Sequence, residues 1–557
     1  MLYPRPKELQ LGKRCPFATP MLVFCADAPS KRALFPLHEM LPEMECVSVD
    51  ERCKATVVLS VVPGIFERAE MYELSVREGA VCVRAKDYRG LINALATLTQ
   101  LLQYENGVFT VPDAEISDYP DAAFRSLMTD PHSKASPMDE VRAQILSMAK
   151  AKMNKLHMHL FDNRGLAYES NLKVPLTPDG VYSKAELREI VWYAAQFGID
   201  VIPEIDIPAH NFALTDMYPN FKCKVKGENG EYIDASGWNM CLGNEECYTL
   251  IDALLAEVAE IFPYEYIHIG TDELDMRDLV NRSPLLISHS EECEICNGFF
   301  APKGLFTLTD RFYWFVNRVY STVTSLGKRL MLWNDSIDIS KAPPIPRDIL
   351  IEFWRVAAEQ RGPVEGCSMQ RFLDEGFEVV NADFPNTYVE EYMEWSRLKK
   401  WDFRKDPADA FERPYQVTGG EMCAWGGSKC PHLLYALYFA LPAFGDRLWN
   451  SGTPIPDDKD ATVGLTRAAL GMDTPNGFDI FAYMKDVPLG TARFWKGNPF
   501  CEGADLQALQ QILAGLKHQS KDVEYLTKEL LRLCKQVENI SLGIEQEGEL
   551  AQKGIDA

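Results

Sequence analysis

The sequence has no apolar run near the roughly 18 residues that a membrane-spanning helix needs. It has no excess of basic charge either: the formal net charge is −24, which would repel a nucleic acid or an anionic membrane surface. Its N-terminus lacks the basic-then-apolar order of a secretory signal, and its 15 cysteines are scattered rather than spaced as a disulfide framework. We therefore expect a cytoplasmic protein with reduced thiols, whose partners include neither nucleic acid nor membrane.

The first part of the chain has the pattern of a small α+β domain. Residues 55–62 form an apolar run typical of a strand, residues 72–85 alternate around a turn at Gly79, and residues 91–102 show helical spacing of Leu and Ala. The length of 557 residues allows two or three domains, and we expect the first to cover residues 1–118.

From residue 119 the pattern changes to a short apolar strand followed by a helix, repeated. The expected strands are 126–129, 155–160, 200–205, 266–269, 329–333, 349–354, 378–381 and 421–425. Helical stretches fill most of the gaps, at 138–150, 184–197, 248–261 and 310–326. Eight parallel strands alternating with helices make a (β/α)8 TIM barrel, expected over residues 119–455. An apolar helical stripe after residue 503 indicates a helical C-terminal region over residues 456–557.

Polar and aromatic side chains gather where these strands end, which is where such a barrel places its catalytic groups. They are Asp130, His132, Asp162, Glu204, Asp206, His210, Asp272, Glu273, Asp335, Trp354, Asp383, Tyr388, Glu421 and Trp425. Taken alone, a strand-end Asp is usually a helix cap and a Trp is usually packing. Together they predict an acid-lined pocket with aromatic walls. Such a pocket suits a sugar, because ring faces stack on indoles while hydroxyls need acceptors.

Several of these strand ends resemble glycoside hydrolase family 20, the β-hexosaminidases, over roughly residues 50–450. The family's fourth strand ends in His-x-Gly-Gly-Asp-Glu, and this chain has His-Ile-Gly-Thr-Asp-Glu at 268–273. Residues 152–160 and 202–210 are similar to the family's second and third strands. Residues 72–76 and 90–98 resemble the α+β domain that precedes such barrels. The ordered matches at separate strand ends make the resemblance specific.

The resemblance implies a retaining exo-β-N-acetylhexosaminidase with no cofactor or metal, acting on an N-acetylhexosamine-containing oligosaccharide or glycoconjugate. In this substrate-assisted mechanism the sugar's 2-acetamido oxygen attacks the anomeric carbon. Glu273 would be the general acid and then the general base, with a pKa raised by a closed pocket and by the neighbouring Asp272 charge. Asp272 would orient the acetamido nitrogen and stabilise its developing positive charge.

The resemblance also assigns supporting roles. Tyr388 matches the tyrosine that hydrogen-bonds the acetamido oxygen, and Arg125 matches the arginine that holds ring hydroxyls. Three tryptophans would wall the acetamido group and the sugar face: Trp333, Trp354 and Trp425. Four residues would orient the acidic pair from behind: His157, Asp206, His210 and His268.

Other functions and specificities stay open on the sequence alone. The family usually has a glutamate two residues after its eighth-strand tryptophan, where this chain has Gly426-Gly427, so a galacto-configured or 6-substituted sugar is an alternative substrate. A non-catalytic sugar-binding barrel is a second alternative. Metal-dependent hydrolysis by His157 and His159 is a third, although no further ligand stands at a diagnostic spacing. Linkage, aglycone and oligomeric state are not determined.

One short motif is left over. Cys293-x-x-Cys296 is half of a zinc site, but no partner pair at the usual spacing accompanies it. Reduced loop thiols are therefore favoured, and a structural zinc is left open.

Overall fold

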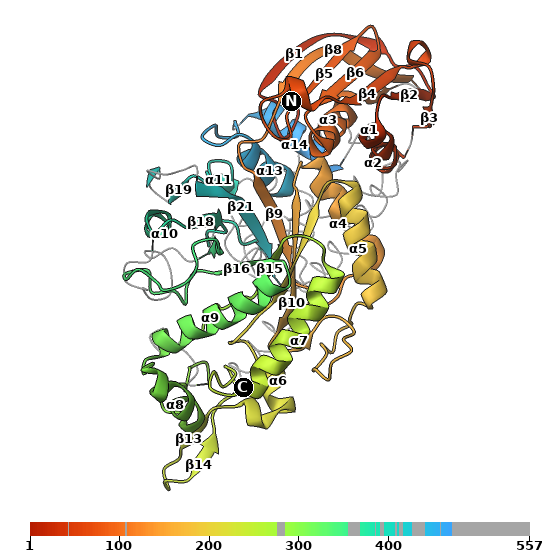
Figure 1. The fold of residues 1–557 in the computed structure, drawn as a ribbon. Helices are drawn as coiled ribbons and strands as arrows, with labels where there is room; N and C mark the ends of the chain where they lie inside the picture. Colours follow the sequence, from red (N-terminus) through yellow and green to blue (C-terminus); the bar gives the residue numbers. More distant parts are fainter. Residues whose placement is uncertain are drawn as a thin grey trace, which may run out of the picture.

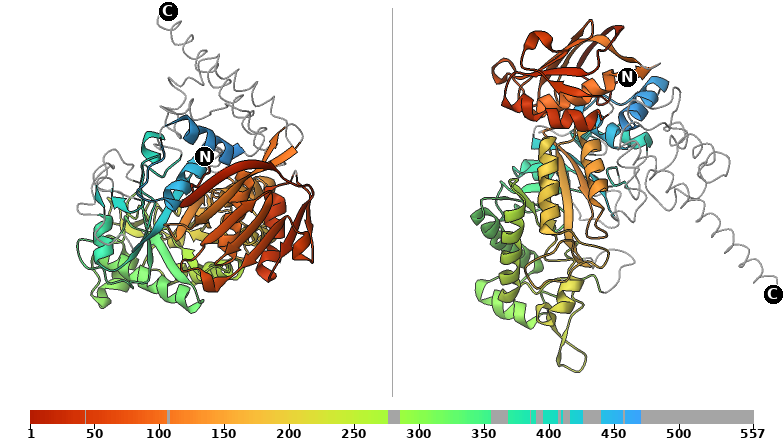
Figure 2. Two further views of the ribbon diagram at one scale, coloured as in Figure 1. Left: turned by 90° about the horizontal axis from the view of Figure 1, so that it is seen from above. Right: turned by 90° about the vertical axis from the view of Figure 1, so that its right-hand side faces the viewer.

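The computed structural model describes residues 1–470 except 43, 106–107, 276–284, 355–367, 385, 390–394, 407–408, 411–415, 426–439 and 457. An N-terminal domain built on a mixed sheet lies over one end of a closed parallel barrel (Figures 1 and 2). The described chain ends with α14 (Lys459–Leu470). The helical region expected beyond residue 503 lies outside the described residues.

The sheet of the N-terminal domain has the order β1-β8-β5-β6-β4-β2-β3, with β7 paired to β8. Its strands are β1 (Glu8–Pro16), β2 (Met21–Cys25), β3 (Cys46–Ser48), β4 (Val57–Val61), β5 (Tyr72–Arg77), β6 (Ala80–Ala85), β7 (Gln103–Glu105) and β8 (Val108–Asp118). The expected hairpin around Gly79 is confirmed as the antiparallel pair β5 and β6. Three helices accompany the sheet: α1 (Ala28–Arg32), α2 (Leu34–Met40) and α3 (Tyr88–Leu101). The last of them, α3, packs against both the sheet and the barrel helix α4 (Met138–Lys150).

All eight strands expected for the barrel are confirmed. They are β9 (Phe124–Thr129), β10 (Lys155–Asp162), β12 (Asp200–Ile205), β15 (Tyr266–His268), β16 (Arg329–Trp333), β17 (Leu350–Phe353), β18 (Glu378–Asn381) and β21 (Val417–Ala424). Each is parallel to the next, and β9 closes the barrel by pairing with both β10 and β21. Because side chains on the strands are buried on both faces, the strands appear in the sequence as short continuous apolar runs.

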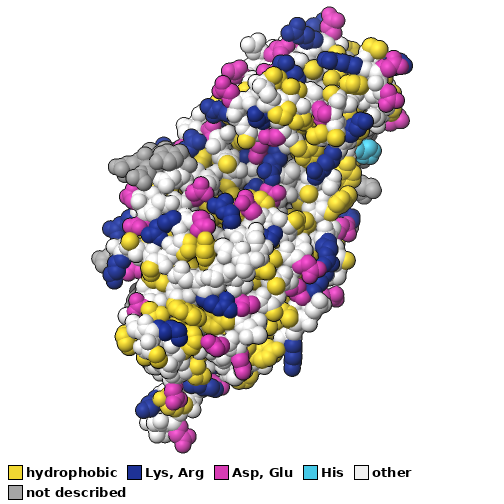
Figure 3. Space-filling model, in the orientation of Figure 1, with side chains coloured by type: hydrophobic (Ala, Val, Ile, Leu, Met, Phe, Trp, Pro, Cys, Tyr) yellow, Lys and Arg dark blue, Asp and Glu magenta, His cyan; other side chains and the backbone are white. Residues whose placement is uncertain are grey.

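Helices follow the strands as the periodicity predicts. Besides α4, the long ones are α5 (Lys184–Gln196), α7 (Glu245–Ile261) and α9 (Leu308–Ser325). Ser183 begins α5 with a reciprocal capping box to Glu186, and Thr307 does the same for α9 with Asp310. No helix among the described residues is long and apolar enough to span a bilayer. On the face drawn in Figure 3, acidic and basic side chains are interspersed.

A buried polar joint connects the N-terminal domain to the start of the barrel strands. The Arg125 guanidinium, at the beginning of β9, bonds Glu70 and donates to the carbonyls of Lys152 and Ala122, each at 2.7 Å. The Lys152 ammonium lies 2.8 Å from Asp118, and both side chains are fully buried. The N-terminal domain therefore covers the end of the barrel where strands begin, and leaves the other end for a site.

At that other end two long connections extend the barrel. The connection between β12 and α7 contains α6 (Phe212–Met217) and the hairpin β13 (Lys224–Lys226) with β14 (Tyr232–Asp234). The connection between β15 and α9 contains α8 (Glu294–Phe300), which packs against β13. Figure 1 shows this hairpin and α8 together, at the end away from the N-terminal domain.

Candidate active site

The tight turn after β15 carries the predicted acidic pair. Gly270, Thr271 and Glu273 all have left-handed backbone, with φ of 65°, 78° and 50°. Neighbouring strand ends hold this turn in place: the Thr271 N–H donates to Asp206 Oδ1 at 3.2 Å, and the Glu273 N–H donates to Asp335 Oδ2 at 2.9 Å. Non-glycine residues in such backbone store strain, and these hydrogen bonds from neighbouring strand ends keep the turn in that conformation.

His210 bridges the acidic pair to a deeper carboxylate. Its Nδ1 lies 3.1 Å from Asp162 Oδ1, and its Nε2 lies 3.4 Å from Asp272 Oδ2 and 3.7 Å from Glu273 Oε2. Asp206 Oδ2 is 4.0 Å from the same imidazole. One ring therefore faces four carboxyl groups, which makes it an electrostatic centre for the site.

Burial and crowding shift the proton affinities of this cluster. Burial raises the pKa of Asp272 to about 7, with the nearby Asp335 and Glu273 carboxyls adding to the rise and His210 opposing it. Burial alone would lower the pKa of His210, but Asp162, Asp206 and Asp272 together hold it well above its ordinary value. The carboxyl groups around it therefore favour the protonated form of the imidazole, while burial favours the neutral form of Asp272.

Aromatic side chains wall the space beside the acidic pair. Tyr388 lies near two indoles, with its ring centroid 6.3 Å from that of Trp354 and 6.5 Å from that of Trp425. The Trp354 indole donates to Asp335 Oδ1 at 3.0 Å, so the carboxylate that holds the Glu273 backbone also orients this wall. Trp354 and Trp425 remain partly exposed, as residues that meet a ligand must.

A network of histidines and glutamates fills the barrel beneath these walls. Glu204 is at its centre and accepts from the Trp333 indole at 2.8 Å. Its carboxylate also lies 3.2 Å from His157 Nε2, 2.5 Å from His159 Nδ1 and 3.0 Å from His268 Nδ1. The three histidine side chains are at most 1% exposed, and each lies against the Glu204 carboxylate.

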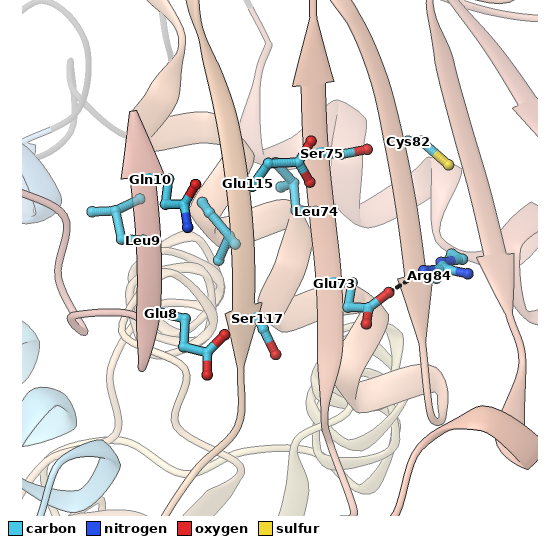
Figure 4. Close-up of a pocket in the computed structure, with 11 residues that line it drawn as sticks. Glu8, Leu9, Gln10, Glu73, Leu74, Ser75, Cys82, Arg84, Glu115 and Ser117 are labelled. Carbon is cyan, nitrogen blue, oxygen red and sulfur yellow. Dashed lines mark hydrogen bonds and ion pairs between the residues drawn. The ribbon is translucent and has the colours of Figure 1, made fainter. Parts of the chain in front are cut away.

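A separate hollow of about 460 Å³ lies on the N-terminal domain and not at the barrel's catalytic end. It is an open face of the sheet, where Arg84 and Glu73 form an ion pair and Glu8 and Glu115 lie nearby (Figure 4). This hollow contains none of the strand-end groups above.

Two protein-family models match this chain. A model described as "Glycosyl hydrolase family 20, catalytic domain" matches residues 123–452, and one described as "Glycosyl hydrolase family 20, domain 2" matches residues 2–119. The chain belongs to glycosyl hydrolase family 20.

Individual relatives agree with this family assignment. The chain is 27% identical over 372 residues to β-hexosaminidase subunit A1 of Dictyostelium discoideum, a match that covers 64% of each protein. It is 32% identical over 442 residues to a β-hexosaminidase of Akkermansia muciniphila, covering 73% of this chain and 84% of that one. The match thus spans less than two thirds of the Dictyostelium protein. The fold is shared with a family 20 exo-β-N-acetylglucosaminidase of Vibrio harveyi solved with N-acetylglucosamine, with a TM-score of 0.70, 20% identity, and coverage of 84% of this chain and 76% of that one.

Most of the residues expected for the family 20 site come together in the structure. Asp272, Glu273, Trp354, Tyr388 and Trp425 converge at the strand ends as described above. Asp206 and His210 contact the acidic turn, and Trp333 lies at the pocket floor with only 1% of its surface exposed. His157 and His268 lie one layer deeper, where they contact Glu204 and the Trp333 ring.

The predicted role of Arg125 in holding ring hydroxyls is wrong. Arg125 stands at the start of β9, at the end of the barrel that the N-terminal domain covers, and it is fully buried. Its guanidinium is bonded to Glu70 and to two main-chain carbonyls there. The resemblance placed it by sequence position, whereas a family 20 ligand-binding group must stand where a strand ends.

Two contributors to the site escaped the sequence argument. Trp238 donates from its indole to the Glu273 carbonyl, and Asn239 donates from its side chain to the Leu274 carbonyl, each at 3.0 Å. The Trp238 ring also lies 4.3 Å from the His210 ring. Both residues belong to the long connection after β12, where no periodicity or motif marks them. The Gly426-Gly427 pair lies outside the described residues.

Proposed function

We propose that this family 20 member is a retaining exo-β-N-acetylhexosaminidase, with the substrate's own acetamido oxygen as nucleophile. The placement of the acidic pair supports this most: Asp272 and Glu273 both approach Nε2 of His210, so they lie on one side of the pocket. Two protein carboxyls acting as acid and nucleophile must flank the scissile bond from opposite sides. An attack from within the sugar removes that requirement.

The proposed chemistry uses the pair in sequence. Glu273 gives its proton to the leaving oxygen while the acetamido oxygen closes on the anomeric carbon, forming an oxazolinium ion. Glu273 then takes a proton from the water that opens this ring, so two inversions leave the configuration retained. Asp272 accepts from the acetamido N–H and offsets the positive charge of the ring. A donor placed there favours the charged form of Asp272, whose proton is held only up to about pH 7 in the free protein.

The aromatic walls support the choice of sugar. The Tyr388 ring lies near those of Trp354 and Trp425, and we expect its hydroxyl to meet the acetamido oxygen while the indoles cover the methyl group and the ring face. The Vibrio harveyi relative was solved with N-acetylglucosamine, which favours an N-acetylhexosamine-containing glycan as the substrate here.

Matched aryl glycosides test the proposal directly. We expect cleavage of aryl N-acetyl-β-glucosaminide with retained configuration, negligible cleavage of the matching β-glucoside, and strong inhibition by a thiazoline mimic of the oxazolinium ion. Equal cleavage of the β-glucoside would overturn the substrate-assisted route. Sugar binding without turnover of any glycoside would identify a non-catalytic barrel instead.

We further propose a relaxed specificity at the outer hydroxyls. A carboxylate that bonds the 4- and 6-hydroxyls penalises sugars that cannot satisfy it, and the sequence has Gly426-Gly427 where the family usually has that glutamate. Activities on N-acetylgalactosaminide and 6-sulfated N-acetylglucosaminide should then reach within roughly tenfold of the plain glucosaminide or exceed it, since one lost hydrogen bond is worth about that factor. A preference of several hundredfold for plain N-acetylglucosaminide would show that another group replaces the glutamate.

A further inference from the structure

Four buried cysteines from the two long connections meet behind the active site. Cys223 precedes β13 and Cys241 precedes α7, while Cys293 caps the N-terminus of α8 and Cys296 lies in its first turn. All four are less than 5% exposed. Their sulfur atoms lie within 4.8 Å of one another. The Cys-x-x-Cys half-site therefore has its partner pair, which is separated along the chain by the β13–β14 hairpin.

The distances between the sulfur atoms suit one tetrahedral ion. A zinc ion with bonds of about 2.3 Å to four sulfurs places those sulfurs about 3.8 Å apart. Cys241 Sγ lies 3.8 Å from Cys293 Sγ and 3.5 Å from Cys296 Sγ. A disulfide requires about 2.05 Å, so these sulfurs stand too far apart to be bonded in pairs.

Main-chain donors point at one of these sulfurs. The N–H of Lys224 lies 3.3 Å from Cys293 Sγ, and the N–H of Cys296 lies 3.5 Å from the same atom. Such donors stabilise a thiolate more than a thiol, because the negative sulfur is the better acceptor. A thiolate is also the form that binds a metal ion.

We propose that Cys223, Cys241, Cys293 and Cys296 bind a single structural Zn²⁺. Four thiolates complete the tetrahedral shell and leave no position for water, so the ion holds the fold together and takes no part in hydrolysis. The sulfurs converge on one point, which suits a single ion rather than an iron–sulfur cluster. Coordination releases the four thiol protons to solvent, and no oxidant or reductant is required.

The ion would connect the two segments that position the catalytic turn. Trp238 and Asn239, three and two residues before Cys241, donate to the carbonyls of Glu273 and Leu274. Cys293 and Cys296 belong to the connection that continues from this same turn. Zinc would thus link the connection after β12 to the connection after β15 and limit the motion of the acidic pair between them.

Metal analysis of the purified full chain tests the site. We expect about one zinc per chain from expression in zinc-containing medium without added chelator. Cobalt substitution should give the near-ultraviolet and visible bands of tetrahedral cobalt thiolate. Cys241→Ser should lose the zinc, whereas Cys247→Ser should keep it, since Cys247 is an equally buried thiol on α7 outside the cluster.

Three outcomes would overturn the proposal: iron in place of zinc, cysteine pairs oxidised to disulfides in the native protein, or full zinc content in Cys241→Ser. If Cys241→Ser does not fold, zinc content and cobalt spectra of the unmodified chain still decide. A strong chelator should lower the melting temperature of the unmodified protein, and zinc should restore it. None of these measurements depends on which sugar the enzyme cleaves.

Discussion

The two ends of the barrel both bury charged side chains, yet they differ in how those charges are paired. At the end covered by the N-terminal domain, Arg125 is bonded to Glu70 and Lys152 to Asp118, one cation for each carboxylate. The remaining donors of the Arg125 guanidinium reach main-chain carbonyls. Charges satisfied in this way hold two domains together and have no capacity left for a ligand.

At the catalytic end the pairing is incomplete. His210 is shared among four carboxyl groups, and the buried atoms that make no hydrogen bond within the described part of the chain include Asp206 Oδ2, His210 Nε2 and Asp272 Oδ1. Buried polar atoms are almost always bonded, so these atoms are available to a substrate or to water.

Backbone strain does not separate the two ends. Glu70 and Lys152 at the covered end have positive φ, of 59° and 58°, and so do His210, Thr271 and Glu273 at the catalytic end. Left-handed residues alone would therefore have marked both regions as functional. The pairing of charges makes the distinction, because each carboxylate of the polar joint has its own cation, whereas four carboxyl groups share His210 at the catalytic end.

The largest effect should come from the covered end. Lys152→Met leaves the Asp118 carboxylate buried without its cation, which should lower the free energy of unfolding by about 3–5 kcal/mol. Urea unfolding measures this loss, and kcat/KM of the folded fraction should stay within about twofold. Lys54→Met removes an exposed ion pair with Glu51 and should cost about 1 kcal/mol or less. A hundredfold loss of activity in folded Lys152→Met would contradict the separation of the two ends.

Substitutions at the catalytic end should lower activity rather than stability. Glu273→Gln and Asp272→Asn should each lower kcat by about a hundredfold, equivalent to about 2.7 kcal/mol, because each removes proton transfer or charge stabilisation. Steady-state kinetics on an aryl N-acetylglucosaminide gives the loss. Glu265→Gln, on an exposed side chain elsewhere on the barrel, serves as the control. Near-normal turnover by Glu273→Gln would remove it from the mechanism.

The raised pKa of Asp272 predicts a smaller, pH-dependent effect. An acid whose pKa rises on folding, here from about 4 to about 7, stabilises the native state below pH 4, and this contribution is lost as the pH rises through 7. Asp272→Asn removes the titrating group and therefore this loss. From pH 4 to pH 8 the free energy of unfolding of the variant should rise relative to that of the unmodified protein by on the order of 1–2 kcal/mol. The effect is smaller than the full pKa change implies because neighbouring groups titrate with Asp272. Unfolding curves at both pH values test this, and an unchanged difference would contradict it.

We expect no effect of a mild reductant on thermal stability. None of the eleven described cysteines forms a disulfide, so a mild reductant should leave the melting temperature unchanged and thiol titration in denaturant should find no disulfides. This result would also support the proposal that the protein works in the reducing cytoplasm. Several intact disulfides would point to an oxidising compartment instead.

The fold was predictable from the sequence because its signals are local. Each barrel strand is a short apolar run ended by polar residues, and α4 coincides with its expected range, 138–150. The acidic pair could also be predicted from the sequence, since it follows β15 directly. Arg125 was misassigned because a motif match carries no information about which end of a strand faces the ligand.

Contacts between distant segments could not be read from the sequence. Cys223 and Cys241 flank a hairpin and join Cys293 and Cys296 only after two connections fold against each other. Trp238 reaches the Glu273 carbonyl in the same way. The spacing of these residues does not predict the contacts, because long-range contacts depend on how the connections pack on the barrel.

The turn before the acidic pair shows that the two adjacent glycines of the family signature are not interchangeable. At Gly270 a Cβ atom would lie 1.9 Å from Asp206 Oδ1, so with this aspartate in place only glycine fits there. At Thr271 the demand is only on backbone conformation, and the threonine hydroxyl lies 3.4 Å from the Trp333 carbonyl. A β-branched residue at φ of 78° costs on the order of 1 kcal/mol. We therefore expect Thr271→Gly to relieve this strain without removing any side chain that is proposed to meet the sugar.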